Sequence, residues 1–360
     1  MDRLSRIFEL NPEGLNWRRG VMFLDVALVP LVVLWAIGEE RYLLSAVFGV
    51  VFTGVIDPGG PYGSRASRLA VFALLGALLT ALGFGIGSSS WGWLVLAAFI
   101  VTLAAGLAVK FGLHRFVAAV LLNVWFFIAM AIGFSANQAQ SSSHTWAQAL
   151  AWLGGSALWI AVTFIAWWLR GRKDSPPTLP ELPGEVTPRE LTRPLIMFAV
   201  IRALVMAGTS VFAFGLDLQH ADWVPIAAIV AMKPSLEQTT LVAEQRLAGA
   251  LIGAAVAALF LLVAAGEHGA RLITFEHALF IIVLVLIMHA MSIRFWNYAL
   301  YCGAMAAAAL IAVDLPHPSN YAAEGDRVLY TFCGVGVAVL VMFLANLLAG
   351  RSARTQPQPN

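Results

Sequence analysis

The sequence YLLSAVFGVVFTGVIDPGGP, at residues 42–61, is an apolar run that stops at two prolines and two glycines. Its apolar part, Tyr42–Ile56, would form a helix about 22 Å long, which is shorter than the roughly 30 Å hydrocarbon core of a bilayer. A second short run, Trp223–Met232, stops at Lys233-Pro234. Because proline removes a helix hydrogen bond and glycine favours turns, each stretch predicts a short, broken helix.

The composition around these runs is that of an integral membrane protein. The 360 residues are 60% hydrophobic and 12% charged, whereas a soluble domain has about 25% charged residues. A net charge of +2 provides no basic field for nucleic acid. Cys302 and Cys333 lie in apolar stretches, where we expect them to pack as small hydrophobic residues. The composition excludes a water-soluble globular protein, a disordered chain and a disulfide-rich secreted module.

The apolar runs predict an all-α membrane protein with about twelve transmembrane segments, six in each half. Besides the two short runs they are Val21–Ile37, Leu69–Ile86, Trp91–Val109, Phe116–Phe134, Ala147–Leu169, Leu195–Gly215, Leu247–Ala265, Ala278–Met291, Trp296–Val313 and Val328–Leu348. Lys and Arg favour the cytoplasmic side of a membrane. With the N-terminus inside, only Arg41, Arg271 and Arg327 of the 22 Lys and Arg residues fall outside. We therefore expect a multi-pass protein of the inner (plasma) membrane with both termini cytoplasmic.

The chain divides at a proline-rich, charged stretch. We expect a first membrane repeat at 1–170, a cytoplasmic linker at 171–194, a second membrane repeat at 195–350 and a cytoplasmic tail at 351–360. The order of features is the same in both halves, and six crossings in each half make them parallel repeats. Such repeats are typical of transporters and channels. The alternative is that duplication built a larger bundle without a transport path.

The two breaks are the first candidate for a binding site. Short segments interrupted by glycine or proline at matching places in two halves indicate the binding site of a transporter. The broken-helix backbone would then lie at Asp57, Pro58 and Pro234. The alternative is that both glycine- or proline-rich stretches are ordinary loops at the cytoplasmic surface, and that the short helices before them thin the bilayer locally.

Two charges lie inside predicted spans. Asp25 and Arg202 occupy equivalent places in the repeats, and a charge near the bilayer centre costs about 2.5–3.5 kcal/mol. Since the signs are opposite, one interpretation is an ion pair that also gates the path. In the other, Arg202 reaches the inner surface and Asp25 faces a water-filled vestibule.

The basic residues Lys233 and Arg246 are the candidate anion ligands. Lys233 lies within the second break, and Arg246 opens a helix that contains Gly249 and Gly253. Rings of Arg or Lys favour anions in pores, although the ordinary excess of cytoplasmic basic residues also accounts for such positions.

Other residues carry weaker signals. His289 is a candidate proton relay; the alternative is a histidine at the membrane interface whose hydrogen bonds are already made. Trp223 can stack on an aromatic substrate, or anchor its helix at the interface. The sequence has no Walker A loop, no G-x-G-x-x-G, no H-E-x-x-H and no G-x-S-x-G. We therefore expect no catalytic site, no metal and no cofactor, and the protein is not expected to be an enzyme.

The chain resembles the fusaric acid resistance protein-like family of aromatic acid exporters. The residues that carry the resemblance are Trp223-x-Pro225, Met232-Lys233-Pro234, Thr239-Thr240, Arg246-Leu247-x-Gly249-x-x-x-Gly253, Tyr301 through Asp314, Asp326-Arg327 and, in the first half, Asp57-Pro58, Arg68-Leu69 and Gly76. The resemblance implies efflux of organic anions, typically aromatic carboxylates, and a periplasmic membrane-fusion adaptor as a partner. It also implies kinship with plant malate channels. Larger members have a cytoplasmic domain, where this chain has only the linker.

The sequence therefore predicts a transporter that exports small organic acids, aromatic ones in particular, across the inner membrane, driven by an ion gradient. Lys233, Arg246 and Arg202 would attract the carboxylate, and Trp223 would contact the ring. The expected partners are the anion, the lipid bilayer, an adaptor and a second copy of the chain. A major-facilitator carrier, a passive anion channel and a non-transport membrane scaffold are the alternatives. Full-length second helices in major-facilitator carriers argue against the first of these.

Overall fold

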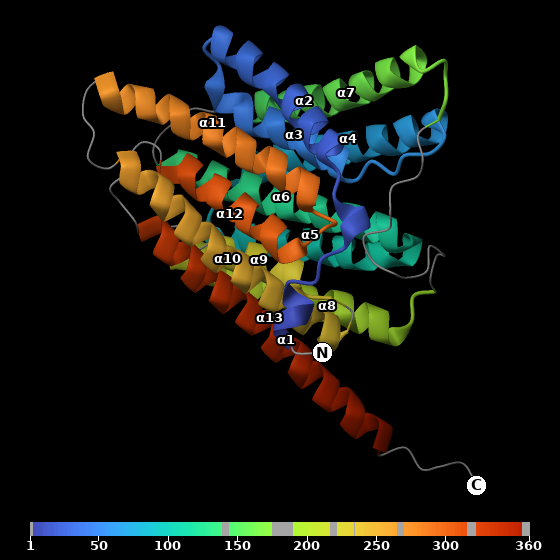
Figure 1. The fold of residues 1–360 in the computed structure, drawn as a ribbon. Helices are drawn as coiled ribbons and strands as arrows, with labels where there is room; N and C mark the ends of the chain where they lie inside the picture. Colours follow the sequence, from blue (N-terminus) through green and yellow to red (C-terminus); the bar gives the residue numbers. More distant parts are fainter. Residues whose placement is uncertain are drawn as a thin grey trace. The chain divides into compact units, whose positions relative to one another are not determined.

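A computed structural model describes residues 3–138, 144–174, 190–216, 222–233, 235–264, 270–314 and 322–354 of the chain (Figure 1). Most of the expected linker and the last residues of the expected tail lie outside the described residues. So does Pro234, one of the three residues expected in the broken-helix backbone.

The described chain is helical, and every apolar run expected from the sequence lies mainly in a helix. In the first half the elements are α1 (Arg3–Ile7), η1 (Pro12–Gly14), α2 (Trp17–Ala36), η2 (Glu40–Tyr42), α3 (Leu43–Val55), α4 (Tyr62–Ile86), α5 (Trp91–Leu107), η3 (Ala108–Phe111), α6 (Leu113–Gln138) and α7 (Thr145–Leu169). In the second half they are α8 (Arg193–Ser210), η4 (Val211–Gly215), α9 (Trp223–Ala231), α10 (Leu236–Ala264), α11 (Ala270–Ile293), α12 (Tyr298–Asp314) and α13 (Ala322–Arg354).

Helix length and composition make this a multi-pass membrane protein. Among the described residues, eight helices are long and apolar enough to cross a membrane. The two broken helices are much shorter, with 13 residues in α3 and 9 in α9. The all-α membrane fold is therefore as expected. Twelve crossings, their orientation and their arrangement as two repeats stay predictions.

The chain forms two compact units. The N-terminal unit is Val21–Ala199, and the C-terminal unit combines Val200–Asn360 with Met1–Gly20. In the C-terminal unit the first residues of the chain pack on the turn between α11 and α12. The Asn11 N–H donates to the Trp296 carbonyl at 2.9 Å, and the Asn297 amide donates to the Glu9 carbonyl at 3.1 Å.

In the N-terminal unit, α3 packs along α7, α4 packs on α6 and α7, and α5 packs on α6. Close approach of α3 and α7 requires small residues. A Cβ atom at Gly155 would overlap the Ala46 carbonyl oxygen. Two buried side-chain hydrogen bonds cross the same interface, from Ser45 to Gln148 at 2.5 Å and from Thr53 to Ser156 at 3.0 Å. Small residues and hydroxyl hydrogen bonds are the usual means by which helices associate in a bilayer.

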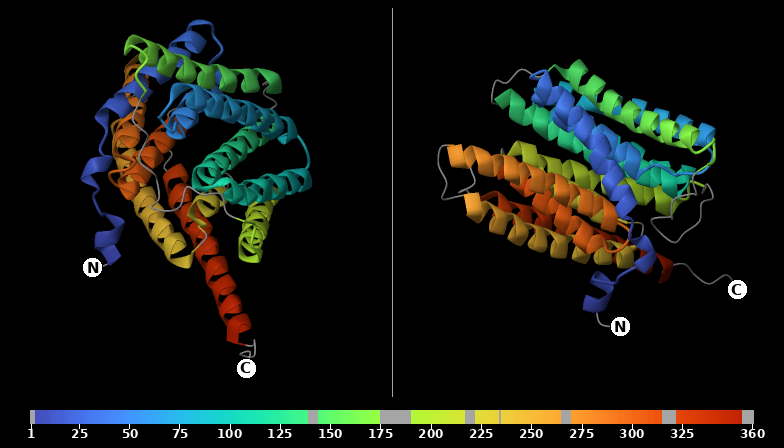
Figure 2. Two further views of the ribbon diagram at one scale, coloured as in Figure 1. Left: turned by 90° about the vertical axis from the view of Figure 1, so that its right-hand side faces the viewer. Right: turned by 45° about the horizontal axis from the view of Figure 1, so that its top comes forward.

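In the C-terminal unit, α9 packs along α13, α10 packs on α12 and α13, and α11 packs on α12. Figure 2 shows α10, α12 and α13, in yellow to red, side by side. Glycines again permit the contact, because a Cβ at Gly249 would lie 2.8 Å from the Ala299 oxygen and one at Gly253 would lie 2.7 Å from the Gly303 oxygen. The helices of the two units correspond in chain order, with α3 to α7 matching α9 to α13. Each helix contact named in one unit then has its counterpart in the other.

Candidate anion-binding site

Two side chains of the C-terminal unit hold the end of α9. The last carbonyls of a helix have no partner within it. Arg202, on α8, is fully buried, and its Nη2 donates to the Ile229 carbonyl at 2.8 Å. The Thr239 hydroxyl, on α10, accepts from the Lys233 N–H at 3.0 Å, and its one hydrogen is shared between the carbonyls of Ser235 at 2.9 Å and Lys233 at 3.1 Å. Thr239 therefore holds the backbone of Lys233, and Arg202 holds the end of α9.

Three partly buried arginines gather in the same unit. Arg246 comes from α10, Arg294 follows α11 and Arg327 comes from α13. All three lie within electrostatic range of Cys302 on α12, and Arg246 and Arg327 are also within range of each other. The Nε atoms of Arg246 and Arg327 are shielded from solvent and make no hydrogen bond to the part of the chain that the structure describes. We call Arg246, Arg294 and Arg327 the arginine cluster.

Aromatic rings accompany each member of the arginine cluster. The Arg327 guanidinium carbon lies 4.7 Å from the centre of the Trp223 ring, and that of Arg294 lies 5.8 Å from the Tyr301 ring. Arg246 and Tyr298 are close enough to interact. A guanidinium binds a carboxylate through two parallel hydrogen bonds, and it also stacks on aromatic faces. Together these groups can bind a small anion that carries an aromatic ring.

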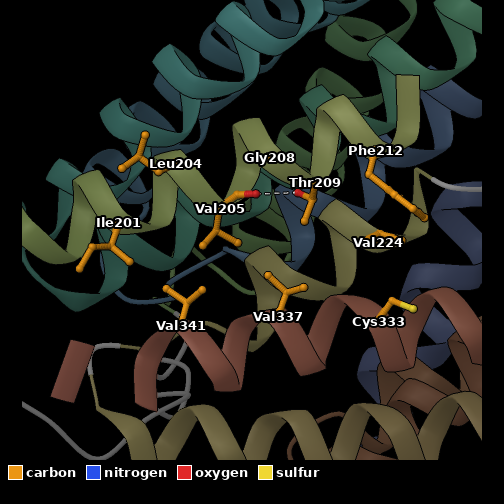
Figure 3. A pocket seen from close by; sticks show the side chains of 10 residues that line it. All are labelled: Ile201, Leu204, Val205, Gly208, Thr209, Phe212, Val224, Cys333, Val337 and Val341. Atoms are coloured by element: carbon orange, nitrogen blue, oxygen red, sulfur yellow. Dashed lines mark hydrogen bonds between the residues drawn. The ribbon is translucent and has the colours of Figure 1, made fainter. Parts of the chain in front are cut away.

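An apolar groove of about 610 Å³ lies in the same unit, between α8, α9 and α13 (Figure 3). It is lined by Ile201, Leu204, Val205, Gly208, Thr209, Phe212, Val224, Cys333, Val337 and Val341. The Thr209 hydroxyl donates to the Val205 carbonyl at 2.9 Å, so its hydrogen-bonding capacity is used within its own helix. Ligand pockets have volumes of about 300–1,000 Å³, so the groove has room for an apolar body. Val224 lines the groove and the neighbouring Trp223 contacts Arg327, so the groove and the arginine cluster both involve α9.

The break of the N-terminal unit is closed by a buried ion pair. Arg65, near the start of α4, donates from Nε to Asp57 Oδ1 at 2.6 Å, and its Nη2 pairs with Oδ2. Trp159 Nε1, on α7, donates to Oδ2 at 3.0 Å, and the Gly59 N–H donates to Oδ1 at 3.1 Å. Pro58 lies in the turn between these partners. Asp57 therefore contributes its side chain as well as its backbone to this break.

The other residues expected at the site lie in varied surroundings. Lys233 is half-buried beside Thr239, and Asp25 is an exposed residue of α2. Asp25 belongs to the N-terminal unit and Arg202 to the C-terminal unit, so an ion pair between them stays a prediction. The His289 Nδ1 lies 2.8 Å from the Val285 carbonyl of its own helix, and the His289 ring packs edge-on against Trp17 at 4.9 Å. A role in proton relay also stays a prediction.

Sequence reasoning missed Arg65 and the part played by Arg327. Arg65 follows Asp57 by eight residues across a turn with two glycines, so a search for an opposite charge on the far side of the break would have found it. Arg327 was expected as a basic residue outside the membrane and as part of the Asp326-Arg327 motif, with no role in binding. Its contact with Trp223 depends on the packing of α9 against α13, which no local pattern encodes.

Comparison with known proteins gives a family match in the C-terminal part of the chain. No curated protein and no solved structure matches the chain. Residues 205–341 match the family model described as fusaric acid resistance protein-like. This interval contains the arginine cluster, Trp223 and the second break. The match confirms the resemblance expected from the sequence over residues 205–341, which are similar to the fusaric acid resistance protein-like family.

Proposed function

We propose that this protein is a transporter that exports small organic anions, with aromatic carboxylates as the substrate class. The observation that carries the proposal is the arginine cluster with its aromatic rings, inside the segment that matches the family. A buried cation is costly in a bilayer unless an anion or a polar group compensates it. Three guanidinium groups within range of one thiol therefore create a region that attracts a mobile anion.

In this proposal the guanidinium groups bind the carboxylate of the substrate, and an aromatic side chain binds its ring. Arg246 and Arg327 have nitrogens that face no protein acceptor among the described residues, so they supply the carboxylate contacts. Trp223 supplies an aromatic face beside Arg327 for the ring of the substrate. Arg202 supports the backbone of α9, and Lys233 adds a further positive charge next to the break.

The membrane arrangement belongs to the same proposal. The identical order of helix contacts in the two units supports two parallel six-segment repeats, with α3 and α9 as the broken second helices. The excess of Lys and Arg on one side supports cytoplasmic termini and insertion in the inner membrane. Coupling to an ion gradient, a periplasmic adaptor and a second copy of the chain complete the proposal.

Uptake of radiolabelled 4-hydroxybenzoate into inside-out vesicles, with and without an imposed proton gradient, tests it. Gradient-dependent accumulation supports a coupled exporter. Equilibration without accumulation indicates a passive anion channel, and no movement of any aromatic acid favours the scaffold.

Arg246→Gln should reduce uptake at least tenfold at equal membrane expression. Arg193→Gln, which removes the same charge at an exposed position on α8, should leave uptake unchanged. Equal loss in both variants would contradict the assignment.

A further inference from the structure

Asp57 occupies a site in the N-terminal unit that is built for a carboxylate. The Arg65 guanidinium contacts both of its oxygens, as bidentate arginine–carboxylate pairs do. The Trp159 indole and the Gly59 backbone add one N–H donor each, at 3.0 and 3.1 Å. At least four donors thus converge on two oxygens, and those from Arg65 and Trp159, on α4 and α7, would also serve another carboxylate.

The surroundings of this site suit an aromatic acid. Arg65 is 8% exposed, Asp57 6% and Trp159 2%, so water competes little for the donors. The Phe23 ring stacks on Trp159 with the ring centres 4.6 Å apart, which gives the site an aromatic wall. Arg65 is the fourth residue of α4, and Gly63 and Ser64 beside it are exposed. The site is therefore within one helical turn of a surface.

The carboxylate of Asp57 is the movable member of the pair. Arg65 and Trp159 are held by the long helices α4 and α7. Asp57 instead follows the end of α3 and precedes Gly59 and Gly60, whose φ angles are +63° and +75°. Glycine adopts left-handed and right-handed backbone conformations at similar cost, so this turn has more backbone conformations open to it than the two helices have.

We infer that Asp57 is an internal substitute for the transported carboxylate, which displaces it from Arg65 during the transport cycle. This inference rests on the proposed function, because it assigns a second contact point to the same substrate class. Exchange of one carboxylate for another keeps Arg65 paired throughout, whereas an unpaired buried guanidinium would be strongly destabilising. The displaced Asp57 loses its donors, so it competes with the substrate for Arg65 and lets the substrate leave again. A conducting site must bind its ion well enough to admit it and weakly enough to release it.

Binding of 4-hydroxybenzoate to the purified full-length protein in detergent, measured by titration calorimetry, tests the inference. Asp57→Asn keeps the size of the side chain and removes the competing charge, so the Kd should fall at least tenfold. Adding Arg65→Gln to that variant should abolish the gain. Arg68→Gln, at an exposed position one turn further along α4, should not change the Kd.

A folded Asp57→Asn protein with the Kd of the native protein would overturn the inference and leave the proposed function intact. A native protein that binds no aromatic carboxylate would overturn both. If Asp57→Asn lowers the melting temperature, thermal shift replaces calorimetry. The acid must then raise the Tm of the variant more than that of the native protein, and the neutral 4-hydroxybenzamide must raise neither. Equal shifts in the two proteins would refute the displacement of Asp57.

Discussion

Replacement of Gly155 by alanine tests how tightly α7 must approach α3. A Cβ at this position would overlap the Ala46 carbonyl oxygen, and it would lie 2.9 Å from the carbonyl carbon and 3.1 Å from the Val50 nitrogen. Ordinary contact with carbon begins at about 3.5 Å. Because the Ala46 oxygen overlaps most, the backbones must separate by roughly 1 Å or more, at the cost of about 1–3 kcal/mol that overpacking of a core commonly carries.

The neighbouring residue provides a matched control. A Cβ at Gly154 would meet nothing within 4 Å. Both substitutions gain the same helix propensity, about 0.5–1 kcal/mol, so the difference between them isolates the overlap. In a unit of this size 1 kcal/mol shifts the Tm by about 2–4 °C, so Gly155→Ala should melt about 2–12 °C below Gly154→Ala. Differential scanning fluorimetry in detergent measures both values. Equal Tm values would refute the close α3–α7 contact on which the position of Asp57 depends.

Two further predictions concern the C-terminal unit. Thr239→Val should lower its stability by about 0.5–1.5 kcal/mol for each hydrogen bond lost around Lys233, which thermal unfolding measures. Thr240→Val should change the Tm less, because that hydroxyl donates only within α10, to the Leu236 carbonyl at 2.9 Å. Trp223→Leu should raise the KM for 4-hydroxybenzoate and leave the KM for hexanoate unchanged in vesicle uptake, because the leucine keeps an apolar contact and removes the aromatic face. A parallel rise for both acids would contradict ring recognition.

The sequence predicts the breaks of the fold well, because their causes are local. The expected end of the first short run at Ile56 is one residue from the end of α3 at Val55, and the expected end at Met232 is one residue from the end of α9 at Ala231. The prolines that follow these two runs lack a backbone N–H and disfavour the helical conformation of the residue before them, whatever the helix packs against. Hydropathy is less exact for α11, which begins at Ala270, eight residues before the expected run. Charged residues in its first turns lower the hydropathy without ending the helix.

The partners of the charged residues could not be predicted in the same way. Arg65 was within reach of local reasoning, since it lies a short turn away from Asp57. The contact of Trp159 with Asp57 spans 102 residues, and that of Arg327 with Trp223 depends on two helices that are distant in the chain. Periodicity shows that a side chain is buried, and it does not show which side chain it meets. Sites that form between helices are therefore visible only after the packing is known.

The two units share an order of helix contacts and differ in the charge that they bury. In the N-terminal unit the buried guanidinium of Arg65 is matched by the carboxylate of Asp57. In the C-terminal unit the fully buried Arg202 donates to a carbonyl, and the arginine cluster lies within electrostatic range of the Cys302 thiol, with Asp222 within range of Arg327. A guanidinium binds a carboxylate more strongly than it binds a neutral carbonyl. Under the proposed function, the transported carboxylate binds at the arginine cluster of the C-terminal unit, whereas in the N-terminal unit the chain's own Asp57 binds Arg65.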